Sequence, residues 1–131
     1  MRPSPSRPKN SARLSAESLG RRGEQLAAWF LRAQLYRILA TRFKTPIGEI
    51  DLVAQRFGVT VFVEVKARQR RAGLGEAMGA VNQRRVVRAA QYYLARHPRL
   101  AATPLRFDVI FLAPMSWPRH VKNAFDAGQD R

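Results

Sequence analysis

The stretch VFVEVKAR, Val61–Arg68, alternates like a β-strand but carries two opposite charges where a buried strand would continue with apolar residues. Successive side chains of a strand point to opposite faces. Valines therefore form one face, and Phe62, Glu64 and Lys66 lie on the other. Taken alone, Glu64 and Lys66 fit a solvated charge pair on a half-exposed sheet, since three-residue matches are common.

The preceding segment, TPIGEIDLVAQ at residues 45–55, predicts a turn followed by a second strand. A hairpin centred on the pair at residues 57–58, with a loop of two or four residues, places Asp51 opposite Glu64. Directly opposed side chains have Cβ atoms about 4.5–5.5 Å apart, so both carboxylates would converge beside Lys66. An odd-length loop without a bulge would send Asp51 to the other face.

Residues 15–34 have the spacing of an amphipathic helix, with Leu19, Leu26 and Phe30 on its apolar face. Glu24 falls on or beside this face, where a carboxylate is unexpected. One interpretation is a residue at the flank of the helix that reaches solvent or pairs with a neighbouring arginine. The other is a third carboxylate directed at the strands.

The remaining segments complete an α/β pattern. We expect a short strand at residues 36–44, a helix from Asn82 to His97 that ends before Pro98, and a strand from Arg106 to Leu112. Residues 119–128 would form a last short strand or turn. This order predicts a mixed central sheet flanked by helices.

The chain has 131 residues, which is enough for one domain with one core, and we assign residues 15–131 to it. Residues 1–14 are rich in Pro, Ser and Arg, and predict a disordered basic arm. An organelle transit peptide is the alternative for this arm, but three prolines in the first eight residues oppose its amphipathic helix.

Charge dominates the composition, with 24 Lys and Arg against 9 Asp and Glu and a net charge of +15. Such a chain attracts polyanions, and nucleic acid is the expected partner. Lipid headgroups are the competing polyanion, but no run approaches the roughly 20 apolar residues of a spanning helix. We therefore expect a cytoplasmic protein with no membrane partner. The absence of cysteine excludes disulfides and thiolate sites, and the two histidines, His97 and His120, are far apart in sequence and do not indicate zinc.

The predicted cluster of carboxylates needs positive charge. Two carboxylates about 4 Å apart repel each other by roughly 1 kcal/mol in water and about 4 kcal/mol at an effective dielectric constant near 20. Glu24 would add a third negative charge if its helix lay over this face, while Lys66 supplies one positive charge. A hard divalent cation, Mg²⁺ or Mn²⁺, would compensate, with Asp51 and Glu64 as ligands and Glu24 bound directly or through water.

A cation held by carboxylates inside a basic shell suits hydrolysis of a phosphodiester, because it polarises a phosphoryl oxygen and acidifies a water. Lys66 would orient that water or stabilise developing charge. Arginines of the following loop and helix would hold the nucleic-acid backbone. These are Arg68, Arg70, Arg71, Arg84, Arg85 and Arg88.

Several segments together resemble a known family. RRGEQLAAWFL, IGEIDLVAQ, VFVEVKAR, LGEAM and RFDVIFL, the last followed by KNAF, are similar to the YraN family of small bacterial proteins over about residues 20–125. That family resembles the PD-(D/E)xK nucleases, in particular archaeal Holliday-junction resolvases. The resemblance implies a restriction-endonuclease-like fold with Glu24, Asp51, Glu64 and Lys66 as the catalytic set, and a metal contact from the backbone carbonyl of Val65.

One position departs from the family pattern. Asn82 stands where the family commonly has a lysine, so a phosphate or substrate contact would have to come from Gln83 or Arg84 instead.

The sequence as a whole predicts a Mg²⁺- or Mn²⁺-dependent nuclease acting on DNA, with branched or structured DNA as the expected substrate. The alternative is a non-catalytic nucleic-acid-binding or ribosome-associated protein that keeps the fold, and a structural partner in a larger complex is a third reading. A homodimer also stays open, because paired incisions require two sites, although no exposed apolar stripe marks an interface.

Overall fold

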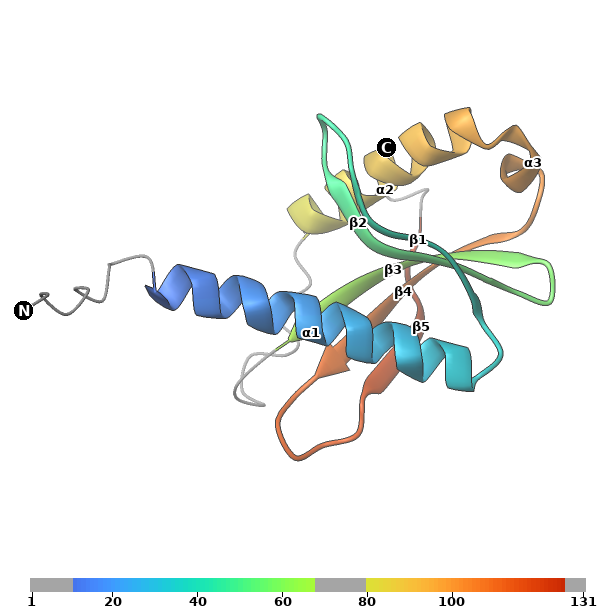
Figure 1. The fold of residues 1–131 in the computed structure, drawn as a ribbon. Helices are drawn as coiled ribbons and strands as arrows, with labels where there is room; N and C mark the ends of the chain where they lie inside the picture. Colours follow the sequence, from blue (N-terminus) through green and yellow to red (C-terminus); the bar gives the residue numbers. More distant parts are fainter. Residues whose placement is uncertain (1–10, 68–79, 127–131) are drawn as a thin grey trace, which may run out of the picture.

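The fold is a five-stranded mixed sheet with helices on both faces, seen in a computed structural model that describes residues 11–67 and 80–126 (Figure 1). Along the chain the elements are α1 (Ser11–Ala33), β1 (Arg37–Lys44), β2 (Glu49–Arg56), β3 (Val59–Ala67), α2 (Ala80–Arg96), α3 (Pro98–Ala101), β4 (Leu105–Leu112) and β5 (Arg119–Phe125). The strands lie in the order β1-β2-β3-β4-β5. Only the pair β3–β4 is parallel, and α2 lies in the crossover that a parallel pair requires. The predicted α/β class with a mixed central sheet is confirmed.

The hairpin of β2 and β3 has the predicted centre and the shorter of the two predicted loops. Its loop consists of Phe57 and Gly58, whose φ angles of 51° and 80° are both left-handed. This is the pattern of a type I′ turn, in which the twist of the turn matches that of the strands. The Cα pairs then run in the predicted register from Arg56↔Val59 to Leu52↔Val63.

The two long helices cover opposite faces of the sheet (Figure 1). On one face, Leu31 and neighbouring alanines of α1 pack on Val61 and Val63. On the other, Val87 and Tyr93 of α2 join the cluster around Phe62. Helix α2, and not α1, therefore covers the face of β3 that carries Glu64 and Lys66. We expected Glu24 to approach this charged face if α1 lay over it. Helix α1 lies on the opposite face instead.

Element boundaries differ modestly from those predicted. Residues 1–10 of the predicted arm lie outside the described residues, and α1 begins at Ser11 where the pattern predicted Ser15. Helix α2 begins at Ala80 and ends at Arg96, and the short α3 that starts with Pro98 was not predicted. Residues 119–128, predicted as a short strand or turn, contain strand β5. Within the described ranges, no helix is both long and apolar enough to cross a membrane.

A fully buried carboxylate, Asp108, ties β4 to β5. Arg106 donates from Nε and Nη2 to its two oxygens at 2.9 and 2.8 Å, and the Asn123 N–H donates at 2.9 Å. His120 donates from Nε2 at 2.7 Å, and Arg106 also donates to the Tyr36 hydroxyl. Burial alone would raise the pKa of Asp108, but the bonds from His120, Arg106 and Asn123 hold it below its usual range. Buried charge of this kind is stable only when it is fully partnered.

The turn between β1 and β2 packs closely against α2 through Gly48. A Cβ atom added at Gly48 would lie 2.7 Å from the backbone carbonyl oxygen of Arg85. Backbone cannot move aside as a side-chain tip can, so we expect Gly48→Ala to lower the free energy of unfolding by about 1–3 kcal/mol. Thermal unfolding of the purified variant measures the loss.

Gly23→Ala is the matched control for this prediction. Its added Cβ would meet the Leu112 Cδ1 atom at 3.3 Å, at the end of a flexible side chain. In a helix interior, alanine is favoured over glycine by about 1 kcal/mol, which offsets the crowding. We expect Gly23→Ala to stay within about 1 kcal/mol of the parent, and equal midpoints for both variants would contradict the close packing of the turn.

Candidate active site

Asp51 occupies the point at which the backbone pairing of β2 and β3 ends. It is 9% exposed, and its Oδ2 atom accepts a hydrogen bond of 2.7 Å from the Val65 N–H. The last Cα pair of the two strands on this side is Leu52↔Val63. The side chain of Asp51 thus continues the link to β3 beyond the last backbone pair, which holds its carboxylate against the backbone of Val65.

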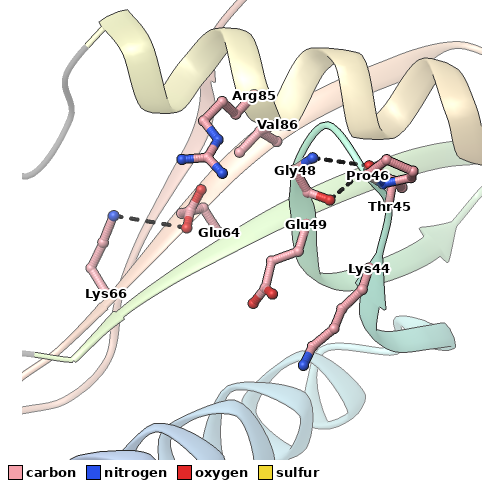
Figure 2. A pocket seen from close by; sticks show the side chains of 9 residues that line it. All are labelled: Lys44, Thr45, Pro46, Gly48, Glu49, Glu64, Lys66, Arg85 and Val86. Carbon is pink, nitrogen blue, oxygen red and sulfur yellow. Dashed lines mark hydrogen bonds and ion pairs between the residues drawn. The ribbon is translucent and has the colours of Figure 1, made fainter.

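Glu64 and Lys66 lie two residues apart on one face of β3, as the alternation predicted. The Lys66 Nζ atom lies 3.8 Å from the Glu64 Oε1 atom, and about a fifth of each side chain is exposed (Figure 2). The Glu64 carboxyl also interacts with the Asp51 carboxyl, and the pKa values of both groups are raised.

The pKa values of Asp51 and Glu64 are both raised. Burial, followed by the charge of Asp51, raises the pKa of Glu64 to about 7, and Lys66 opposes the shift. The pKa of Asp51 is raised as well, first by burial, while the Val65 N–H opposes the rise. Both shifts follow from negative charge held away from water with too little positive charge nearby.

Glu24 reaches Asp51 from α1, on the opposite face of the sheet. Burial and the charge of Asp51 raise its pKa to about 7. Its Oε1 atom also lies 3.4 Å from the Nε atom of Arg42 in β1. Glu24 therefore pairs with Arg42 and interacts with Asp51.

A fourth carboxylate, Glu49, was not singled out from the sequence. Its charge raises the pKa of Glu24, Asp51 and Glu64 alike. It lies two residues before Asp51 on β2, so the strand period in EID already placed both side chains on one side. That spacing was the signal that could have found it.

Glu49, Glu64 and Lys66 line a pocket of about 330 Å³ between the β1–β2 turn and α2, whereas Asp51 and Glu24 are not among its lining residues (Figure 2). Figure 2 shows Arg85 pointing from α2 toward Glu64, while Glu49 and Lys44 extend from the neighbouring strands. The pocket thus has a floor of carboxylates and a partly basic rim. Its lining consists of Lys44, Thr45, Pro46, Gly48, Glu49, Glu64, Lys66, Arg85 and Val86.

The predicted basic residues divide into two groups. Arg84, Arg85 and Arg88 are exposed on α2, and of these Arg85 lines the pocket. Arg68, Arg70 and Arg71 lie outside the described residues, as does the side chain of Asn82.

The donor set suits a hard divalent cation. In the described ranges, no group of three or more His, Cys, Asp or Glu side chains is arranged to hold a metal ion. Mg²⁺ commonly keeps several waters and takes only one or two protein carboxylates, and the neighbouring Asp51 and Glu64 would supply two. The residues therefore fit Mg²⁺ or Mn²⁺, with Glu24 as a further carboxylate beside Asp51. The Val65 carbonyl stays a prediction.

The raised pKa values predict how stability depends on pH. The folded carboxyls of Glu24 and Glu64 have pKa values of about 7 against 4.5 for the ordinary group. The folded state therefore binds more protons than the unfolded state between these values, and stability falls as pH rises through that window. We expect the thermal midpoint of the metal-free protein to fall from pH 5 to pH 8, and Glu64→Gln to flatten the fall.

Addition of Mn²⁺ at pH 8 tests the same pair. It should raise the midpoint of the parent, because a ligand that binds only the folded state stabilises it, and should leave Glu64→Gln nearly unchanged. An equal Mn²⁺ effect in both proteins would place cation binding elsewhere.

Comparison with known proteins identifies the family. The sequence model of the uncharacterised protein family UPF0102 matches residues 23–112. A UPF0102 protein of Rhodopseudomonas palustris is 50% identical over 122 residues, which cover 93% of this chain and 94% of the relative. A UPF0102 protein of Chelativorans sp. is 51% identical over 122 residues, which cover 88% and 96%. The chain therefore belongs to the UPF0102 family, the YraN family that its motifs resemble.

Proposed function

We propose that this protein is a Mg²⁺- or Mn²⁺-dependent nuclease of restriction-endonuclease-like fold that hydrolyses phosphodiester bonds in DNA, with branched or structured DNA as its substrate. One observation carries the proposal. Asp51 interacts with both Glu64 and Glu24, the pKa values of all three carboxyls are raised, and Lys66 lies beside Glu64 in a chain whose net charge is +15. Carboxyls with strongly perturbed pKa values beside a pocket are candidates for a functional site.

Asp51, Glu64 and Lys66 have separate roles in the proposed hydrolysis. A divalent cation bound by Asp51 and Glu64 would polarise a phosphoryl oxygen and acidify a water. Lys66 holds a positive charge 3.8 Å from the Glu64 carboxylate, where it can orient the attacking water and stabilise the charge that develops on the phosphate. Its charge is fixed in place before the reaction, so little reorganisation is needed.

The rim of the pocket holds the substrate. Arg85 and Lys44 line it from opposite sides, and Arg84 and Arg88 are exposed on the same helix as Arg85. Basic side chains at these places would contact successive phosphates and release condensed counterions, which favours binding at low salt. The carboxylate floor alone would repel DNA, so the basic rim is required for a phosphodiester to approach.

The test is incubation with single-stranded, duplex, flap and four-way-junction DNA, each with EDTA, Mg²⁺ or Mn²⁺. We expect cleavage only with a divalent cation, and most on flap or junction DNA. A Lys66→Ala preparation purified in parallel controls for contaminating nucleases. Absence of cleavage on every substrate with either cation would reject the nuclease proposal.

A non-catalytic nucleic-acid-binding protein is the second candidate. It is favoured by the net charge of +15 together with the absence, in the described residues, of a three-ligand metal group. Binding of DNA or ribosomal RNA that weakens steeply with salt, without cleavage of any substrate, would support this candidate.

A further inference from the structure

A second pocket, of about 400 Å³, lies between α1 and β1. It shares Glu24 with the carboxylate cluster, because the same side chain lines this pocket and contacts Asp51. Its volume lies within the usual range of small-molecule sites. Besides Glu24, its lining includes Gln25, Trp29, Arg32, Thr41 and Arg42.

We propose that this pocket binds an unpaired nucleobase of the nucleic-acid substrate, stacked on Trp29, so that a displaced nucleotide lies next to the carboxylate cluster. The inference rests on the proposed function in taking nucleic acid as the ligand. It adds the class of substrate: a strand with at least one base free of pairing, as in single strands, flaps and junctions.

Trp29 provides the surface for stacking. Its side chain is 71% exposed although it lies in the middle of a helix whose neighbouring Ala28 and Leu31 are buried. Gln25, Trp29 and Arg32 follow one another at helical spacing and line the same pocket. Stacking of a base on an aromatic side chain contributes about 1–3 kcal/mol and tolerates any sequence.

Polar groups at the rim match the rest of a nucleotide. Arg32 and Arg42 bring positive charge for a phosphate, and the Gln25 amide has both donors and acceptors for a base edge. Arg42 has a left-handed φ of 50° within β1, a conformation that costs a non-glycine residue energy. The 3.4 Å contact between the Arg42 Nε and Glu24 Oε1 atoms links this rim to the carboxylate cluster.

Charge favours nucleic acid over a second copy of the chain. A two-fold symmetric dimer would place the same patch against itself, so Arg32 and Arg42 would face their own copies in a protein that already carries +15. A polyanion meets the same arginines favourably. The exposed indole then contacts the one apolar part of a nucleotide, which is its base.

The test uses fluorescence in EDTA, where no cleavage intervenes. Trp117, the second of two tryptophans, is replaced by phenylalanine so that Trp29 is the only indole. Titration with a single-stranded oligonucleotide should quench Trp29 strongly, whereas the blunt duplex of the same sequence should quench it little. Quenching that is absent, or equal for both DNAs, would overturn the proposal.

Affinity measurements on Trp29→Ala give the second readout. Loss of the stacking energy predicts single-strand binding weakened roughly 5- to 150-fold, with duplex binding changed less than about twofold and Trp29→Phe close to the parent. Leu26→Ala is the matched control, because Leu26 is an exposed apolar residue of the same helix that does not line this pocket. Equal losses on single strands and duplex for Trp29→Ala would reject base stacking.

The remaining outcomes separate the two proposals. Metal-dependent cleavage with an unquenched Trp29 would reject the base pocket and keep the nuclease. Selective quenching without any cleavage would keep the base pocket and favour the binding protein. A Trp29 spectrum that shifts with protein concentration in the absence of DNA would assign the pocket to a second copy and reject a nucleobase.

Discussion

Lys66→Ala is expected to lower metal-dependent cleavage of DNA by about a hundredfold or more while DNA affinity stays close to that of the parent. The size follows from the loss of a positioned electrostatic group at the reacting phosphate. The Lys66 Nζ atom is held 3.8 Å from Glu64, and the Lys66 side chain is about four-fifths buried. Water cannot replace a charge held in that position, whereas the many other basic residues of the chain maintain binding.

Lys44→Ala is the matched control, because Lys44 lines the same pocket and is exposed. It removes an equal charge from the rim, so it should weaken DNA binding slightly and leave cleavage at saturating DNA nearly unchanged. Single-turnover rates with excess enzyme measure both variants. Similar losses for the two lysines would show that Lys66 acts only through general attraction of DNA.

Glu64→Ala separates metal binding from DNA binding. It removes one of the two carboxylates proposed to hold the cation, so cleavage and the stabilisation by Mn²⁺ should be lost together. Metal-free binding of DNA should be equal to the parent or tighter, because one negative charge no longer opposes the phosphates. Parent-like cleavage by both Glu64→Ala and Lys66→Ala would place any nuclease activity at another site.

Asp108→Ala is expected to cause the largest loss of stability, about 3–5 kcal/mol. Asp108 is fully buried and accepts hydrogen bonds from Arg106, His120 and the Asn123 N–H. Removal of the carboxylate leaves these donors unpaired, and an uncompensated buried charge carries a penalty of this size. Urea unfolding at pH 7, or the loss of soluble protein if the variant cannot fold, measures the effect.

The double variant Arg106→Met, Asp108→Ala serves as the control for this mechanism. It removes the guanidinium together with its carboxylate partner. The stability losses of the single variants Arg106→Met and Asp108→Ala should therefore add up to more than the loss of the double variant. A loss below about 1 kcal/mol for Asp108→Ala alone would show that the cluster contributes little to stability.

Local sequence patterns were enough to predict the charged strand and its partner. Alternation along Val61–Arg68 placed Glu64 and Lys66 on one face because the strand pleat has a period of two. The pairing with β2 followed from a short loop, confirmed as Phe57 and Gly58 in a two-residue turn. These features are local, so a few neighbouring residues suffice to predict them. EID carried the same information about Glu49, and that signal was overlooked.

Which helix covers which face of the sheet could be seen only in the folded chain. Both α1 and α2 have an apolar stripe, and a stripe indicates that a helix is buried without naming the surface it meets. The parallel pair of β3 and β4 requires a crossover, which α2 provides on the side of Phe62. Helix α1 packs on the valine face, so Glu24 meets Asp51 from the side opposite to α2.

The buried cluster at Asp108 was equally beyond prediction from sequence. Its partners lie on two strands and on the segment before β1: His120 is 12 positions away along the chain, and Tyr36 is 70 positions from Arg106. The pattern RFD reads as an ordinary strand with alternating side chains. Whether an aspartate there is solvated or enclosed depends on which donors the folded sheet brings to it. The same holds for the pKa values of Glu24 and Glu64, because burial and neighbouring charge, which exist only in the folded chain, set them.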